Sequence, residues 1–220
     1  AILTESALNL FRAYAEAGGT VLFGARTGYK DERGHVRMMP LPGFAASLCG
    51  ITVEDFTIVK GTVSAPALRW VDEQDGGAPS DSGAITADGF IDILRVESGT
   101  VKVLAEYASD YYAGQPALTV NEVGQGRVYY YGAAYNEAVI RKLLPRLELR
   151  KAAHDVVNAP AEVELAVRRH PDTGESFVFA LNFSGQPVTL RFQRETVDLL
   201  SGRTLEGEVE LEPYGVLLLN

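Results

Sequence analysis

Glycines and a lysine within residues 24–34 have the residue types of a phosphate-binding loop. Such a loop needs Gly-Lys-Ser/Thr after its spacer, so that backbone amides and the lysine converge on phosphate. Gly24 is followed four residues later by Gly28, but Tyr29 separates Gly28 from Lys30 and no Ser or Thr follows for magnesium. The dinucleotide fingerprint also fails, because a charged turn rather than a helix follows Gly28. We therefore predict no nucleotide site and no cofactor here.

Cys49 is the single thiol of the chain and so the one candidate cysteine nucleophile. A reactive cysteine of the amidotransferase type sits on a tight strand-to-helix turn, near a histidine and a glutamate that raise its thiolate content. Cys49 instead ends a helix predicted over residues 43–49, and His35, His154 and His170 lack His-x-Glu spacing. We interpret Cys49 as a small buried apolar residue. One cysteine and three scattered histidines also predict no metal site.

Two Asn-Glu pairs, Asn121-Glu122 and Asn136-Glu137, have the residue types of a glycosidase acid/base. That role needs a second carboxyl about 5–5.5 Å or 6.5–9.5 Å away, in a shared pocket. The first pair lies in a glycine-rich hairpin, where both residues are ordinary turn formers. The second starts a predicted helix, where Asn caps and Glu suits the helix dipole. We therefore predict no catalytic residue in this chain.

The composition is that of an ordinary globular protein with an acidic surface. The chain has 220 residues, is 46% hydrophobic and carries a net charge of -9. A surface of that charge repels phosphate backbones and anionic lipid, so we expect neither nucleic acid nor membrane as a partner. No apolar run is long enough to span a bilayer and no secretory signal is visible. The single cysteine excludes an intrachain disulfide, so we expect a cytoplasmic protein. The chain begins without Met at the start of a helix, and we interpret it as a piece of a longer protein.

The first part of the chain alternates helical and strand patterns, which is typical of an α/β layer. Apolar residues recur at helical spacing from Thr4 to Tyr14, and Gly18-Gly19 supplies a helix stop. The tyrosine run 129–131 falls in a predicted strand, so we expect it to divide between core and surface. The predicted elements are a helix from residue 4 to the glycines at 18–19, strands at 20–23, 51–59 and 101–107, a helix at 43–49, a mobile loop at 73–83, a hairpin of 117–120 and 127–131 with a loop longer than two residues, and a helix near 137–144.

Beyond residue 155 the pattern changes to strict alternation of apolar and polar residues, separated by turn sequences. This period predicts an antiparallel β domain of five or six strands. We expect Phe177, Phe179 and Phe183 to lie on one inward face, leaving Tyr214 as the clear exposed aromatic. That expectation argues against carbohydrate binding by residues 158–220, which stays open as an alternative.

Motifs in one order along nearly the whole chain resemble the C-terminal half of glycoside hydrolase family 42 β-galactosidases. Each motif is weak alone, and the order gives the resemblance its specificity. They are Tyr14…Gly18-Gly19-Thr20, Arg26-x-Gly28 with Asp31-Glu32, Pro42-Gly43, Leu48-Cys49-Gly50-Ile51-x-Val53-Glu54, Gly114-x-Pro116-Ala117-x-Thr119-x-Asn121, Gly124-x-Gly126, Tyr131-Gly132, Leu181-Asn182, Asp198-Leu199-Leu200-Ser201-Gly202 and Pro213-Tyr214-Gly215-Val216.

The resemblance implies an α/β fold in two parts. Residues 1–155 would be a trimerisation domain, a flavodoxin-like layered domain similar to class I amidotransferases, and residues 156–220 a small antiparallel β-sandwich-like domain. The catalytic TIM barrel with both catalytic glutamates would lie N-terminal to Ala1. The implied role is a non-catalytic oligomerisation module of a homotrimer. The alternatives are a carbohydrate-binding accessory module and, less favoured, an amidotransferase-like enzyme that uses Cys49.

A closed trimer requires head-to-tail contacts between copies. The segment of residues 26–32 is a candidate part of that contact. We expect Arg26, Tyr29, Asp31 and Glu32 to contribute, because an arginine fork and carboxylates can pair across an interface. The alternative is a solvated loop of mixed charge.

Overall fold

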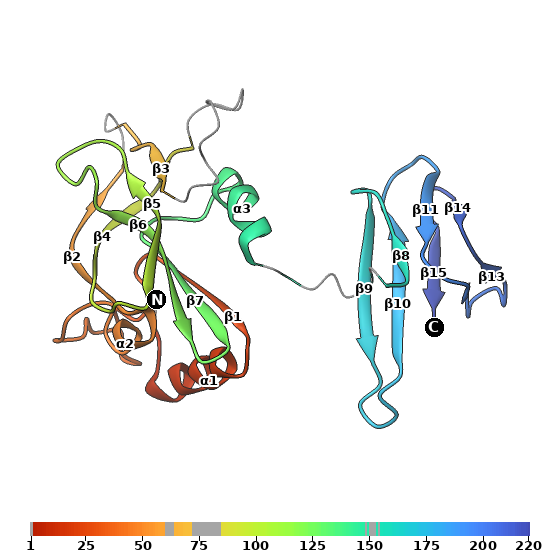
Figure 1. The fold of residues 1–220 in the computed structure, drawn as a ribbon, viewed down its shortest axis with the longest axis horizontal. Coiled ribbons are helices and arrows are strands. Elements are labelled where there is room, and N and C mark those ends of the chain that lie inside the picture. The colour runs from red at the N-terminus through yellow and green to blue at the C-terminus, as the bar shows by residue number, and fades with distance from the viewer. Residues whose placement is uncertain (1, 60–63, 72–84, 148, 150–152, 154) are drawn as a thin grey trace. The chain divides into compact units, whose positions relative to one another are not determined.

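The computed structural model describes the chain as two compact units, Ala1–Glu148 and Leu149–Asn220 (Figure 1). The loop predicted to be mobile at 73–83 and His154 lie outside the described residues. The described residues are 2–59, 64–71, 85–147, 149, 153 and 155–220.

The helix and strand predicted at the start of the chain are confirmed. Thr4 caps α1, its hydroxyl accepting a hydrogen bond from the Ala7 amide at 3.0 Å. The helix ends before Gly18, which adopts a φ of 101° that only glycine accepts readily. The described elements of the first unit are α1 (Glu5–Glu16), β1 (Thr20–Gly24), α2 (Ala45–Cys49), β2 (Ile51–Ile58), β3 (Leu68–Trp70), β4 (Phe90–Val96), β5 (Val101–Tyr107), β6 (Pro116–Val123), β7 (Gly126–Tyr131), α3 (Glu137–Leu143) and the 3-10 helix η2 (Leu144–Leu147).

The main sheet of this unit contains both parallel and antiparallel strand pairs. This arrangement does not support the prediction of a flavodoxin-like fold. Its strand order is β1-β7-β6-β5-β3, and β2 and β4 form a separate pair. Among the described pairs, β1 with β7 is the one that runs parallel. A flavodoxin-like layer needs parallel strands joined by crossover helices. Here β5, β6 and β7 follow one another antiparallel, so the unit is mostly β-strand with small helical content.

The loop between β6 and β7 has two residues, so the prediction of a longer loop is wrong. Val123 pairs with Gly126, and Gly124 takes a φ of 59° at the first loop position. Asn121, expected in the turn, lies buried within β6. The side-chain amide of Asn121 donates a hydrogen bond to the Leu48 carbonyl oxygen at 2.9 Å. The strand therefore continues through the Asn121-Glu122 pair because a buried hydrogen bond holds it there.

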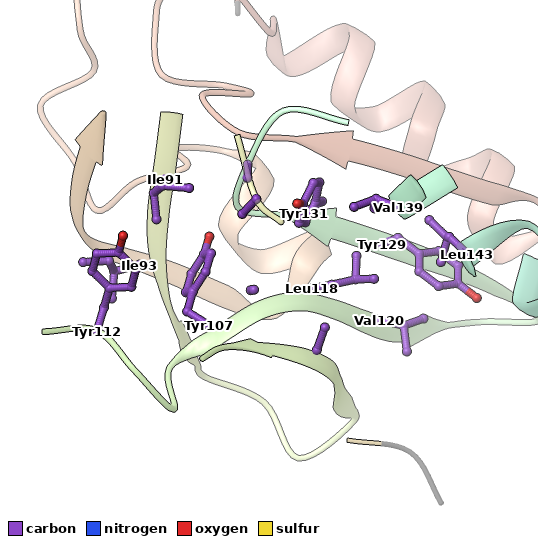
Figure 2. Close-up of a cluster of buried hydrophobic side chains, with 14 of the residues drawn as sticks. Ile91, Ile93, Tyr107, Tyr112, Leu118, Val120, Tyr129, Tyr131, Val139 and Leu143 are labelled. Atoms are coloured by element: carbon purple, nitrogen blue, oxygen red, sulfur yellow. The ribbon is translucent and has the colours of Figure 1, made fainter. Parts of the chain in front are cut away.

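Two apolar cores lie on the two faces of the main sheet. Tyr130 of β7 packs into the core that α1 and α2 cover, whereas Tyr129 and Tyr131 pack into the core that α3 covers. Figure 2 shows the second core, with Tyr129 and Tyr131 beside Val139 and Leu143 of α3. The prediction that tyrosines 129–131 divide between core and surface is wrong, since both faces of this central strand are buried.

The second unit is antiparallel β, as alternation predicted, but it has eight described strands rather than five or six, arranged as small sheets. Strand orders are β15-β10-β9 and β14-β11-β8, with a short β12-β13 pair. Strands of both three-stranded sheets contribute to one apolar core. Its described strands are β8 (Val157–Asn158), β9 (Val163–Arg169), β10 (Ser176–Asn182), β11 (Val188–Phe192), β12 (Thr196–Val197), β13 (Thr204–Leu205), β14 (Glu208–Leu211) and β15 (Val216–Leu219).

The inward face predicted for the phenylalanines of this unit is wrong. On β10 the buried side chains are Val178 and Ala180, while Phe177 and Phe179 are partly exposed. Phe183 is exposed beyond the end of the strand. The pairing register with β9 and β15 places the smaller side chains toward the core. Alternation gives the period of a strand but not which of its faces is buried.

Asp198 is a buried carboxylate that ties the turn after β12 to the last strand. Its Oδ1 accepts hydrogen bonds from the Leu218 amide at 3.1 Å and the Leu200 amide at 3.2 Å, and the Ser201 hydroxyl donates to Oδ2. Burial by itself raises the pKa of Asp198, but these hydrogen bonds outweigh it and leave the pKa below its ordinary value. The carboxylate form is therefore the one that the fold stabilises.

We expect replacement of Asp198 by asparagine to destabilise the second unit at neutral pH by about 1–3 kcal/mol. The pKa of Asp198 is depressed in the folded state. The wild type should therefore have the larger free energy of unfolding at pH values above the ordinary Asp pKa of about 3.9, and this difference from the variant should be lost as the pH falls through the folded pKa. Urea unfolding followed by far-UV circular dichroism should show the two proteins converging in acid. The exposed Asp172→Asn is the matched control. An equal difference at all pH values would contradict the prediction.

Candidate interaction surface around Arg26

Arg26 lies just after β1 in a backbone conformation that is uncommon for a residue with a side chain. Its φ is 65°, and its amide donates to Asp92 Oδ2 at 2.9 Å. Its guanidinium carbon stands 4.5 Å from the ring centres of Tyr29 and Phe56, and 4.8 Å from that of Phe90. A cation enclosed by three ring faces is held in one place by cation–π attraction. The strained backbone persists because these contacts determine it.

Asp92 of β4 is the polar centre beneath this cluster. It is fully buried, and its Oδ2 also accepts the Tyr130 hydroxyl at 2.9 Å. The Tyr107 hydroxyl donates to the Asp92 carbonyl at 3.1 Å. Burial, and then the charge of Asp92, raises the pKa of Tyr29 far above its ordinary value. Tyr29 therefore remains a neutral phenol that packs inside the first unit.

The structure brings together two of the four residues that the sequence proposes for an interface. Arg26 and Tyr29 share the cluster. Asp31 instead holds its own turn, with Oδ1 accepting the Arg33 and His35 amides at 2.9 Å each. The hydrogen bond from the His35 amide is the main reason that the pKa of Asp31 is lowered. Glu32 is exposed on the same turn.

Sequence reasoning missed the partners of Arg26, which come from β2 and β4. Strand β4 was not predicted, although Phe90–Val96 is an apolar run with a single acid within it. In the antiparallel pair, Phe56 stands opposite Asp92 and Ile58 opposite Phe90. Phe56 is 47% exposed, Ile58 46% and Phe90 40%. We call Arg26, Phe56, Ile58 and Phe90 the Arg26 surface.

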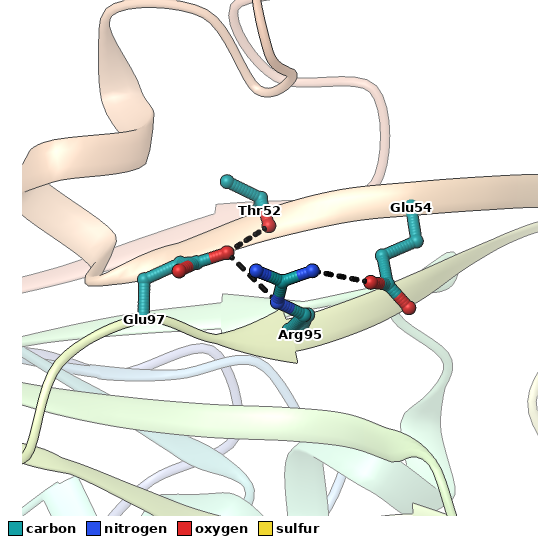
Figure 3. A network of polar contacts seen from close by, with 4 residues as sticks. All are labelled: Thr52, Glu54, Arg95 and Glu97. Atoms are coloured by element: carbon teal, nitrogen blue, oxygen red, sulfur yellow. Dashed lines mark hydrogen bonds and ion pairs between the residues drawn. The ribbon is translucent and has the colours of Figure 1, made fainter.

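A polar network joins the two strands that carry this surface. Figure 3 shows Arg95 of β4 reaching between two acids, Glu54 of β2 at 3.0 Å and Glu97 at 3.1 Å. The Thr52 hydroxyl donates to Glu97 at 2.7 Å. The hydrogen bond to Glu54 and the charge of Glu97 raise the pKa of Arg95. Exposed ion pairs contribute little stability, so we assign this network only a small part in holding the two strands together.

The reactive residues that the sequence suggested, Cys49 and the two Asn-Glu pairs, are buried or engaged in structural contacts. Cys49 is buried in the core under α1, and burial raises the pKa of its thiol. Glu122 pairs with Lys102 at 2.6 Å, and Asn136 caps α3 by accepting the Val139 amide at 3.0 Å. Within the described part of the chain, no three His, Cys, Asp or Glu side chains gather as metal ligands.

Two family models cover almost the whole chain. Residues 1–153 match the β-galactosidase trimerisation domain, and residues 162–220 match the β-galactosidase C-terminal domain. This chain belongs to glycoside hydrolase family 42. The family-42 resemblance carried by the sequence motifs is thereby confirmed. The likeness to an amidotransferase is not supported by any of these matches.

Similar proteins agree with this family-42 membership. The chain is 28% identical to β-galactosidase Pbg of Clostridium perfringens over 94% of its length, and 28% identical to β-galactosidase LacZ of Heyndrickxia coagulans over 99%. It superposes on the crystal structure of β-galactosidase from Bacillus circulans sp. alkalophilus with a TM-score of 0.81 at 26% identity, over 99% of this chain and 31% of that one. The chain spans 29% of the length of the first of these two relatives and 30% of the second. None of its described helices has the length and apolar character needed to cross a bilayer.

Proposed function

We propose that this chain is the assembly part of a β-galactosidase that hydrolyses terminal β-galactosides through a TIM barrel outside these 220 residues. Residues 1–155 form the trimerisation domain and residues 156–220 the C-terminal β domain. The match of residues 1–153 to a family trimerisation domain is the observation that carries the proposal. The working unit is a homotrimer, and this chain supplies no catalytic group.

The Arg26 surface is the part of the first unit that we propose lies at a subunit contact. Half-exposed aromatic side chains are the usual anchors of protein interfaces. The guanidinium of Arg26 keeps Phe56 and Phe90 in place before any contact forms, which lowers the ordering cost of association. Asp31 and Glu32 lie on the same segment but outside the Arg26 surface, and we propose that they offer carboxylate oxygens to cations of the neighbouring copy beside the apolar contact.

Sizing the purified chain tests this proposal. We expect multi-angle light scattering to give a mass three times that of one chain, in an equilibrium that dilution shifts toward monomer. An aryl β-galactoside should not be cleaved above the buffer rate. A single-chain mass at every concentration, or galactoside hydrolysis that purifies with the chain, would contradict the proposal.

One observation favours carbohydrate binding by the second unit as a second candidate function. An open depression there is lined by the exposed ring of Phe183 beside Glu162, Glu164, Ser184 and Ala161. An aromatic face next to carboxylates can stack on a sugar ring and accept its hydroxyl hydrogens. Calorimetric titration with galacto-oligosaccharide tests it. Heat that is lost in Phe183→Ala would support this function, and no heat would exclude it.

A further inference from the structure

Helix α1 exposes an apolar stripe in addition to the one that it buries. Leu8 and Ala15 face the core. On another side of the helix, Leu10 is 74% exposed, Tyr14 57% and Phe11 39%. Leu10 and Tyr14 are four residues apart and Phe11 and Tyr14 three, so the three side chains are neighbours on the helix surface. We call Leu10, Phe11 and Tyr14 the α1 stripe.

Contacts within the unit hold two members of the α1 stripe in place. The ring of Phe11 packs edge-on against Phe23 of β1, with centroids 5.4 Å apart. The ring of Tyr14 lies over Gly19, where a β-carbon would stand 2.3 Å from it. The α1 stripe is therefore an ordered apolar surface suited to a partner.

A cyclic trimer needs two different surfaces on each copy, because a ring of three closes only through head-to-tail contacts. The described part of the first unit exposes apolar side chains in several places, and the α1 stripe and the Arg26 surface are two of these places on separate elements. Each copy carries a net charge of -9, so copies repel except where a contact avoids acidic side chains. The α1 stripe has no charge and the Arg26 surface carries only a cation.

We propose that the α1 stripe of one copy docks on the Arg26 surface of the next, and that three such contacts close the ring. This inference rests on the proposed trimer and names the two surfaces that build it. Leu10 and Tyr14 of one copy bury their side chains against Phe56, Ile58 and Phe90 of its neighbour. The contact is apolar and aromatic, with the guanidinium of Arg26 as its one charged group.

Single substitutions break one half of the contact at a time. We expect Leu10→Glu, on the stripe, and Ile58→Glu, on the Arg26 surface, each to reduce the mass from trimer to single chain. Leu200→Glu in the second unit is the matched control and should remain trimeric, since Leu200 is 63% exposed on neither surface. Circular dichroism and the fluorescence of Trp70, the one tryptophan, verify folding. If a variant is misfolded, Leu10→Gln or Ile58→Thr replaces it.

Mixing the two variants decides whether the surfaces meet each other. The Leu10→Glu chain keeps its Arg26 surface and the Ile58→Glu chain keeps its α1 stripe, so one intact contact can form between them. Native mass spectrometry with one chain labelled by ¹⁵N should show a heterodimer and no trimer. Variants that remain trimeric, or a mixture that stays monomeric, would overturn this inference alone. A wild-type chain that is monomeric would overturn the proposed function with it.

Discussion

Replacement of Asp92 by alanine is expected to lower the free energy of unfolding of the first unit by about 2–6 kcal/mol. The change removes the acceptor of two donors, the part-buried Arg26 amide and the buried Tyr130 hydroxyl, each 2.9 Å from Asp92 Oδ2. Each donor left without a partner costs about 1–3 kcal/mol. The effect is large because Asp92 is fully buried and water cannot replace it.

Urea unfolding followed by the fluorescence of Trp70 measures this effect, since the one tryptophan lies in the first unit. Asp92→Asn is the matched control, because it keeps the shape and one acceptor oxygen and should cost less than the alanine variant. A loss below about 1 kcal/mol for Asp92→Ala would show that the carboxylate does not hold this cluster. Weaker trimer formation should accompany the loss, because the Arg26 backbone depends on the same carboxylate.

Replacement of Gly126 by alanine is the second change with a large expected effect. A β-carbon at this position would stand 2.2 Å from the Gly19 carbonyl oxygen and 2.3 Å from that of Ala15. Both are backbone atoms, one near the end of α1 and one just before β1, so no side chain can turn away to make room. We expect a loss of about 3 kcal/mol or more, as for severe overpacking.

Thermal unfolding of the Gly126→Ala chain, followed by Trp70 fluorescence, measures this loss. Gly99→Ala is the matched control, since nothing lies within 4 Å of a β-carbon there and its φ is not positive. The control should be neutral or slightly stabilising, because alanine restricts the unfolded chain. Equal melting temperatures for the two variants would contradict the predicted clash.

Local sequence determined the helices and several strand positions of this protein. Asn136 is the N-cap of α3 as predicted, and Thr4, where the first helix was predicted to begin, is the N-cap of α1, because a cap needs only the next three residues. Gly50 ends α2 with a φ of 66°, again a local property. The predicted strand at 101–107 has the bounds of β5. The order of weak motifs identified the family, although no single motif is specific to it.

Tertiary structure alone decided which faces are buried and which residues meet. Period two on β10 did not reveal that Val178, rather than Phe179, faces the core, because the pairing register sets that choice. The partners of Arg26 lie on β2 and β4, 30 and 64 residues away in sequence at Phe56 and Phe90, beyond the reach of any local pattern. Caps and turns depend on neighbours along the chain, whereas burial depends on neighbours in space. The α1 stripe depends on both kinds of neighbour. The spacing of apolar residues predicted its helix, whereas the packing of the unit decided that Leu10 and Tyr14 are exposed.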